Sequence, residues 1–210
     1  MKKILLAICF LFSLNGINAQ DMAALFTAMP DQYIPQLENA WRKDLVDLYN
    51  SGKEAKLKNT MEGFSTLKKL TPDYLSLQVT DNSAIEIKRL PLVNNTYILC
   101  VVNTAFGPVA DSRVSFFTSE WKPLEAADLF TAVTPQWFIR EDTDQKDEKF
   151  LFAAASLDVQ LIEYTLSPDN FTLTATYTTP SYLSKEDREH VLPYLKETPR
   201  IYKWEKSHFE

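Results

Sequence analysis

The sequence predicts an α+β fold in which helices pack on antiparallel sheet, built from two related helix-then-strands halves. Near the N-terminus the hydrophobic spacing is helical, and it then changes to the alternation that is typical of strands. A helix-opening phrase in residues 23–33 returns in residues 127–137, at an offset of 104. A Pro-Asp turn in residues 70–74 returns in residues 166–170. Since internal repeats decide a fold, these echoes predict one half over about 21–124 and another over about 125–210.

The first 19 residues have the pattern of a signal peptide. Lys2 and Lys3 form a basic start, residues 4–14 are apolar but too short to span a bilayer, and Ala19 is a small residue suited to cleavage. Cys9 lies inside the apolar run and not at the cleavage point, so the chain is not expected to be a lipoprotein. No later stretch predicts a transmembrane anchor. We therefore expect a single domain over 20–210, exported to the periplasm or secreted.

Composition excludes several classes of partner. The net charge is −6, and it becomes −8 without the two lysines of the signal peptide. Nucleic-acid binding needs a basic surface, so it is not expected, and anionic membrane surfaces are disfavoured for the same reason. Cys100 is the one cysteine after the signal peptide, so no intrachain disulfide is expected. It lies in an apolar run, which favours a role as a small core residue.

The first half begins with helices. Asp21 can cap a helix over 22–29 that Pro30 ends. A second helix is predicted over 36–50, with Leu37, Trp41, Leu45 and Leu48 on one face. Residues 53–59 form a basic, exposed connection.

About five strands follow in the first half. Residues 75–79 and 85–87 alternate apolar and polar side chains, which predicts antiparallel strands with one face in solvent. Residues 96–104 are almost continuously apolar and predict a central strand covered on both faces. Residues 112–119 predict the last strand of this half, which closes near Trp121.

The second half is expected to repeat this order in shorter form. The repeated phrase predicts a helix over 126–133, and charged residues 141–149 lead into a short helix through 155. Residues 159–166 and 171–178 predict a hairpin, and 200–205 a final strand. A capping box at 184–187 predicts a helix to about 196, which Pro193 would kink or shorten.

Several of these motifs also support a family resemblance. They are residues 166–169, 178–186 and 201–204, together with 107–108 ahead of 111–114 and Trp121. With them the chain resembles a family of exported proteins of unknown function from Gram-negative anaerobic bacteria. The resemblance implies an envelope location and a pseudo-repeated α+β fold similar to that of β-lactamase inhibitor protein. It implies no activity, so no catalytic residues are transferred.

The residues needed for common catalytic chemistries are missing. His190 and His208 have neither triad nor zinc-ligand spacing, so neither a catalytic triad nor a metal site is expected. Only three glycines follow the signal peptide, far apart, so no nucleotide or other cofactor is expected. Asp111, Asp158 and Glu163 remain as weak candidates for acid-base work. The sequence therefore favours a protein that is not an enzyme.

Tyr33 and Trp137 are the candidate ligand or partner contacts. They hold equivalent places in the repeated phrase, each just beyond a proline where an aromatic ring can be half exposed. The alternative is that both rings pack as hydrophobic plugs, which is the commoner arrangement for large aromatics. We expect a non-enzymatic binder of an envelope protein or glycan. The second hypothesis is a small-molecule or glycan binder, and the third a carboxylate-dependent hydrolase.

Overall fold

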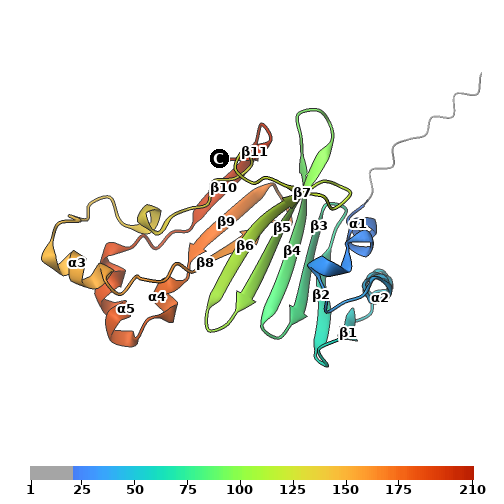
Figure 1. Cartoon of the computed structure of the whole chain (residues 1–210), viewed down its shortest axis with the longest axis horizontal. Helices are drawn as coiled ribbons and strands as arrows, with labels where there is room; N and C mark the ends of the chain where they lie inside the picture. The colour runs from blue at the N-terminus through green and yellow to red at the C-terminus, as the bar shows by residue number, and fades with distance from the viewer. Residues whose placement is uncertain (1–20) are drawn as a thin grey trace, which may run out of the picture.

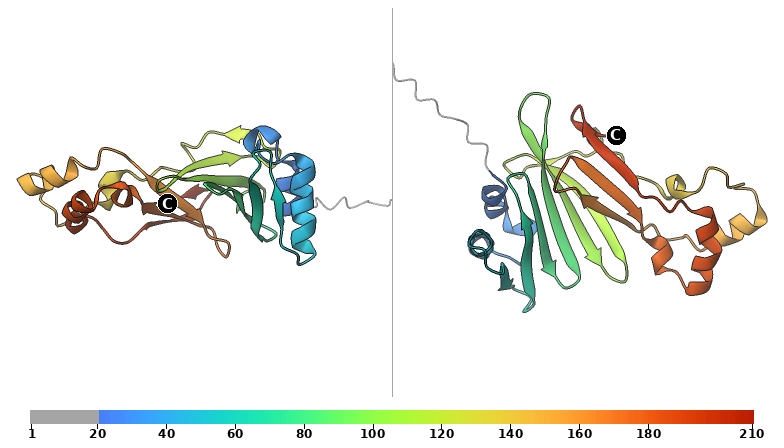
Figure 2. Two further views of the ribbon diagram at one scale, coloured as in Figure 1. Left: turned by 90° about the horizontal axis from the view of Figure 1, so that it is seen from below. Right: turned by 180° about the vertical axis from the view of Figure 1, so that it is seen from behind.

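The computed structural model describes residues 21–210, and the predicted signal peptide with its cleavage point at Ala19 lies outside them. The chain forms two antiparallel sheets with helices, which confirms the α+β class (Figure 1). One group of helices lies at the N-terminal end of the large sheet and another at the far end of the molecule, as Figure 2 shows from two further directions. None of the helices in the described range is long and apolar enough to cross a membrane.

The larger sheet is a meander in which each strand pairs with the next along the chain. Its strands are β1 (Lys56–Lys58), β2 (Phe64–Leu70), β3 (Tyr74–Thr80), β4 (Ser83–Pro91), β5 (Tyr97–Phe106), β6 (Ala110–Phe117) and β7 (Pro123–Leu124). The predicted turn at 71–73 joins β2 to β3. Because β1 and β7 are very short, sequence alternation could not reveal them, and the seven strands exceed the five expected.

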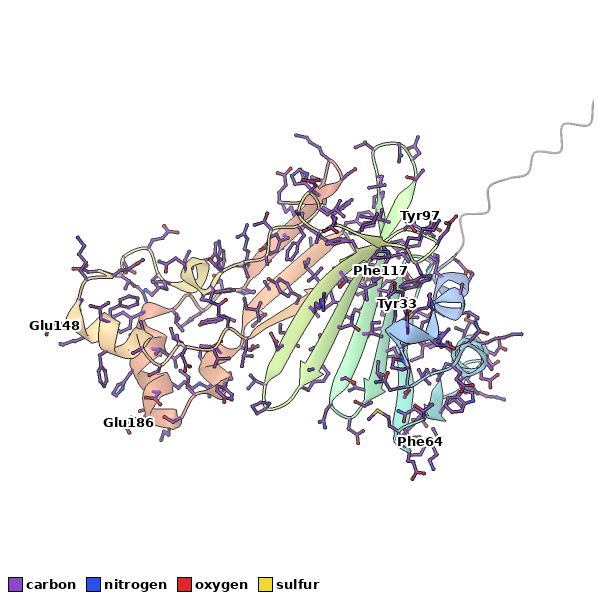
Figure 3. The ribbon with its side chains drawn as sticks, viewed as in Figure 1. Tyr33, Phe64, Tyr97, Phe117, Glu148 and Glu186 are labelled. Atoms are coloured by element: carbon purple, nitrogen blue, oxygen red, sulfur yellow. The ribbon has the colours of Figure 1, made fainter. Side chains whose placement is uncertain are left out.

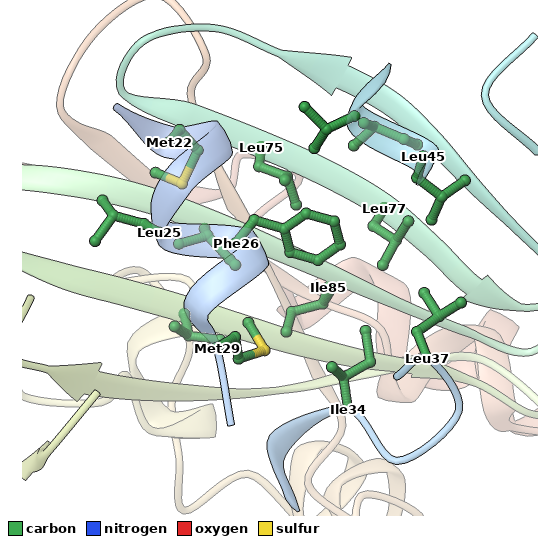
Figure 4. Close-up of a cluster of buried hydrophobic side chains, with 14 of the residues drawn as sticks. Met22, Leu25, Phe26, Met29, Ile34, Leu37, Leu45, Leu75, Leu77 and Ile85 are labelled. Atoms are coloured by element: carbon green, nitrogen blue, oxygen red, sulfur yellow. The ribbon is translucent and has the colours of Figure 1, made fainter. Parts of the chain in front are cut away.

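The first half begins with α1 (Met22–Ala28), the 3₁₀ turn η1 (Asp31–Tyr33) and α2 (Asn39–Asn50). As predicted, the Asp21 side chain caps α1 by accepting a hydrogen bond from the amide of Ala24 at 2.8 Å. Side chains of both helices pack on one face of β3 and β4 (Figure 4). This cluster includes Met22, Leu25, Phe26, Leu45, Leu75, Leu77 and Ile85. The second helix starts at 39 and not 36, so Leu37 is buried from the preceding loop.

The smaller sheet has the order β11-β10-β9-β8. The elements of this half are η2 (Pro135–Phe138), α3 (Glu148–Ala154), β8 (Ile162–Leu166), β9 (Thr172–Tyr177), α4 (Thr179–Tyr182), α5 (Lys185–Val191), η3 (Leu192–Tyr194), β10 (Arg200–Glu205) and β11 (His208–Phe209). The predicted hairpin joins β8 to β9, and the helix after Ser184 stops at Val191, where Pro193 enters a 3₁₀ turn.

Strand β8 connects the two sheets. Three of its backbone amides donate to side chains of the large sheet: Ile162 to Asp111 Oδ1 at 3.1 Å, Tyr164 to Ser112 Oγ at 3.0 Å, and Leu166 to Glu86 Oε2 at 2.8 Å. A second hydrophobic cluster lies between the sheets. It includes Leu90, Cys100, Val102, Phe116, Leu173 and Tyr202. The prediction that β4 has one face in solvent is therefore wrong, because the small sheet covers it.

The helix predicted over 126–133 is not formed. Residues 125–134 run as an irregular strap over the small sheet, where Phe130 pairs with Phe209 and the amide of Val133 donates to the hydroxyl of Tyr164. In the repeat, Glu125 stands where Asp21 caps α1, and glutamate is a poor N-cap, so the helix start is lost. The 3₁₀ turns η1 and η2 do begin at positions that differ by the same offset of 104.

Candidate functional site

Two adjoining pockets, of about 410 and 670 Å³, lie on the large sheet beside the N-terminal helices. Both are lined by Tyr33, Ile85, Asn103 and Arg113, so we describe them together as the Tyr33 groove. The groove lies over the part of β4, β5 and β6 where α1 and α2 no longer cover the sheet.

The floor of the groove is set by strand register. Ile85 on β4 pairs with Asn103 on β5, which pairs with Arg113 on β6. Residues that face each other across antiparallel strands project to the same side, so these three form one row across the sheet. Asn103 and Arg113 are exposed, which makes this row the polar part of an otherwise largely apolar face.

The wall of the groove is aromatic (Figure 3). Tyr33 packs edge-on against Phe117, with 4.8 Å between the ring centroids, and lies 6.2 Å from the ring of Trp121. The Tyr33 hydroxyl donates to the backbone carbonyl of Trp121 at 3.4 Å. Trp121 is buried and its indole N–H donates to the carbonyl of Leu25 at 3.0 Å. Tyr33 is thus a half-buried ring on a fixed base, with one face left to the pockets.

A buried arginine holds the loop that carries Tyr33. The Arg42 guanidinium on α2 is fully buried, and it donates to Asp31 Oδ1 at 2.9 Å within η1. It also donates to the backbone carbonyls of Phe26, Thr27 and Met29 around the end of α1, and to that of Leu37 just ahead of α2. Because these bonds join the end of α1, η1 and the residues ahead of α2, Arg42 fixes the chain path that carries Tyr33.

Arg113 is the basic side chain that lines both pockets. Within residues 21–210 its side chain forms no ion pair and no hydrogen bond. Asp111 lines one pocket and Glu125 the other, but the Asp111 carboxylate already accepts the amide of Ile162. A free guanidinium presents parallel donors that match a carboxylate, and the Asn103 amide beside it adds a donor and an acceptor.

Trp137, the second predicted contact residue, lies elsewhere. It is half buried on η2 and packs in the cluster between the sheets, edge-on to Phe138. The Lys196 ammonium lies 4.7 Å and the Arg200 guanidinium 5.7 Å from the centre of its ring. The structure therefore does not bring Tyr33 and Trp137 together, and the ring face of Trp137 is occupied by cations of its own chain.

The three candidate carboxylates are also separated. Asp111 lies at the groove, and Asp158 lies exposed in the loop after α3. Glu163 lies on β8, where its charge raises the pKa of Glu86 in addition to the larger effect of burial. Among the residues described, no group of three His, Cys, Asp or Glu could hold a metal ion.

Sequence reasoning missed two ionisable residues on β4. Glu86 accepts hydrogen bonds from the Tyr74 hydroxyl at 2.5 Å and from the Leu166 amide, and its burial raises its pKa. Lys88 is buried and pairs with Asp73 at 2.9 Å. Burial of Asp73 opposes its ionisation, but Lys88 holds the pKa of the Asp73 carboxyl below the usual value. Their alternation with Ile85 and Ile87 looked like a solvent face, so the sequence carried no signal for them.

Comparison with known proteins places the chain among proteins of unknown role. Residues 14–209 match the family described as "Protein of unknown function (DUF3256)". The fold is similar to the structure of a domain of an uncharacterized protein from Porphyromonas gingivalis W83, with a TM-score of 0.80 and 27% identity over 89% of this chain and 96% of that chain. No curated protein matches this chain.

Proposed function

We propose that this chain, which belongs to the DUF3256 family of proteins of unknown function, is an exported, non-enzymatic module that binds a protein of the cell envelope. The observation that carries the proposal is the Tyr33 groove, where Arg113, which has no ion-pair partner among residues 21–210, lies in a polar row beside a fixed aromatic wall. A segment of a partner with a carboxylate for Arg113 and an apolar side chain for Tyr33 fits this chemistry.

Export rests on the N-terminal sequence. Residues 2–19 combine a basic start, a short apolar run and a small residue at the expected cleavage point. We place the mature chain in the periplasm or outside the cell on this ground.

We also propose that 20–210 is a single domain of two halves derived from one unit, similar to the tandem-repeat fold of β-lactamase inhibitor protein. The matching 3₁₀ turns and the two Pro-Asp hairpins support a common origin. The amides of β8 that bond to the large sheet support one domain. The missing helix at 126–133 weighs against the repeat at that point.

A small-molecule or glycan ligand is the second candidate for the same groove. Pocket volumes of about 410 and 670 Å³ are in the range of small-ligand sites. An aromatic ring beside amide and guanidinium donors also suits a sugar. The hydrolase hypothesis has less support, because Asp111 is the one candidate carboxylate that lines the groove.

The test is a pull-down of the tagged chain from its native envelope fraction after mild crosslinking. We expect one stoichiometric protein partner, lost in the Arg113→Glu variant and weakened in Tyr33→Ala. The matched control is Arg188→Glu, which makes the same charge change at an exposed arginine on α5. A partner that is retained by both groove variants would refute the proposal that it binds at the Tyr33 groove. Recovery of a glycan in place of a protein, lost in the same variants, would favour the second candidate.

A further inference from the structure

The end of the large sheet formed by β1 and β2 presents lysines and exposed apolar side chains together. We call Lys56, Lys58, Lys68, Met61 and Phe64 the basic corner. Figure 3 shows Phe64 at the tip of β2, at the end of the molecule opposite α3 and α5. The basic corner is separate from the Tyr33 groove, because none of its residues lines either pocket.

Strand register brings three of these side chains, those of Lys56, Lys58 and Phe64, to one face. Lys58 pairs with Phe64, and Lys56 pairs with Thr66, so all four project to the same side. The alternate residues Leu57 and Ser65 point to the core. The Lys56 ammonium lies 4.7 Å from the centre of the Phe64 ring, so charge and aromatic surface are in direct contact.

The turn between β1 and β2 holds the apolar side chains in solvent. Met61 is 66% exposed and Phe64 is 51% exposed. The buried side chain of Asn59 fixes the turn, because it donates to the Val79 carbonyl at 3.0 Å and accepts the Met61 amide at 3.0 Å. The exposure of these two residues is therefore set by the fold, and no rearrangement is needed before they meet another surface.

The local charge is opposite to that of the whole chain. Residues 53–69 contain five lysines and two glutamates, in a protein whose net charge is −6. In the described part of the chain, Lys56, Lys58 and Lys68 form no ion pair. Lys56 and Lys58 beside the projecting apolar turn, with Lys68 further along β2, thus form a local site for an anionic surface, although the net charge disfavours one.

We propose that the basic corner docks the protein on an anionic phospholipid membrane. Met61 and Phe64 enter the interfacial region, where apolar and aromatic side chains are favoured. The lysines reach the headgroups while their alkyl stems stay against the apolar residues. A bilayer fits this surface better than an acidic protein does, because the apolar residues project from a turn and form no pocket for a partner's side chain.

The test is cosedimentation with lipid vesicles. We expect binding to vesicles of phosphatidylcholine and phosphatidylglycerol in equal parts, little binding to phosphatidylcholine alone, and loss of binding in high salt. Each lysine near an anionic surface contributes about fivefold to partitioning, so Lys56→Gln with Lys58→Gln should reduce binding at least about tenfold. Phe64→Ser should reduce it further. All variants are expressed in the same bacterial strain, so that the predicted signal peptide is processed in the same way in each of them.

Matched controls are available at the other end of the molecule. Lys146→Gln with Lys149→Gln removes the same charge, and Phe152→Ser removes a phenylalanine that is 72% exposed on α3. These variants should bind vesicles as the unchanged protein does. Equal loss in the controls, or binding that does not depend on phosphatidylglycerol, would overturn the proposal. Because Arg113→Glu lies outside the basic corner, retained vesicle binding in that variant would separate this docking from the groove.

Discussion

Replacing Arg42 by methionine tests whether this one side chain holds the path that presents Tyr33. Methionine fills much of the same volume but cannot donate to the surrounding carbonyls. Arg42 is fully buried and donates to four backbone carbonyls as well as to Asp31. Its loss leaves buried acceptors without donors, which costs more than the net value of the bonds themselves.

The expected loss is about 3–5 kcal/mol in the free energy of unfolding, since each buried carbonyl that is left without a donor costs about 1–3 kcal/mol. The Asp31 pair adds little to this, since the Asp31 side chain is 61% exposed and solvent screens it. For a chain of this size the melting temperature should fall by roughly 10 °C.

Urea unfolding followed by circular dichroism measures the difference, with Asp31→Asn as the control. We expect the control to lose less than about 1 kcal/mol, because it removes only the solvent-exposed partner. Arg42→Lys should lie between the two, since an ammonium has fewer donors than a guanidinium. If Arg42→Met and Asp31→Asn were equally stable, the carbonyl contacts would not organise the loop.

Three further outcomes follow from buried groups. Burial raises the folded-state pKa of Glu86, so its contribution to stability is present at low pH and is lost as pH rises through that pKa. The stability of the unchanged protein relative to Glu86→Gln should therefore grow on acidification towards pH 4.5. Urea-unfolding profiles of the two proteins that run parallel against pH would contradict this. Cys100→Ser should cost about 1–3 kcal/mol in urea unfolding, because the hydroxyl replaces a fully buried thiol whose pKa burial raises, whereas unchanged stability would place it outside the core. Trp137→Ala should lower the free energy of unfolding by about 2 kcal/mol, which is less than the loss for a fully buried aromatic side chain. A change below about 0.5 kcal/mol by the same assay would show that the ring makes no stabilising contact.

Much of the local structure followed from short stretches of sequence. The cap at Asp21, the two Pro-Asp hairpin turns and the shortening of a helix by Pro193 each depend on residues a few positions apart. The helix predicted over 126–133 does not form, because Glu125 stands at the position that corresponds to Asp21 and caps a helix poorly.

Of the two predicted contact residues, Tyr33 lines the groove and Trp137 does not, although they hold equivalent places in the repeated phrase. The neighbours decide this difference: Tyr33 meets an uncovered strip of sheet, while Trp137 meets Lys196 and Arg200. Those cations come from residues about 60 positions further along the chain, and single-sequence periodicity contains no information on such pairs.

The sequence by itself determined the α+β class, the order of most elements and the burial of Cys100, because these depend on local propensity and on apolar runs. Only the tertiary structure decided that β8 crosses the large sheet, that Glu86 and Lys88 are enclosed, and that Arg113 lines the same groove as Tyr33. Alternation along a strand tells which residues share a face, but it does not tell what covers that face. Contacts between segments far apart in the chain make that choice.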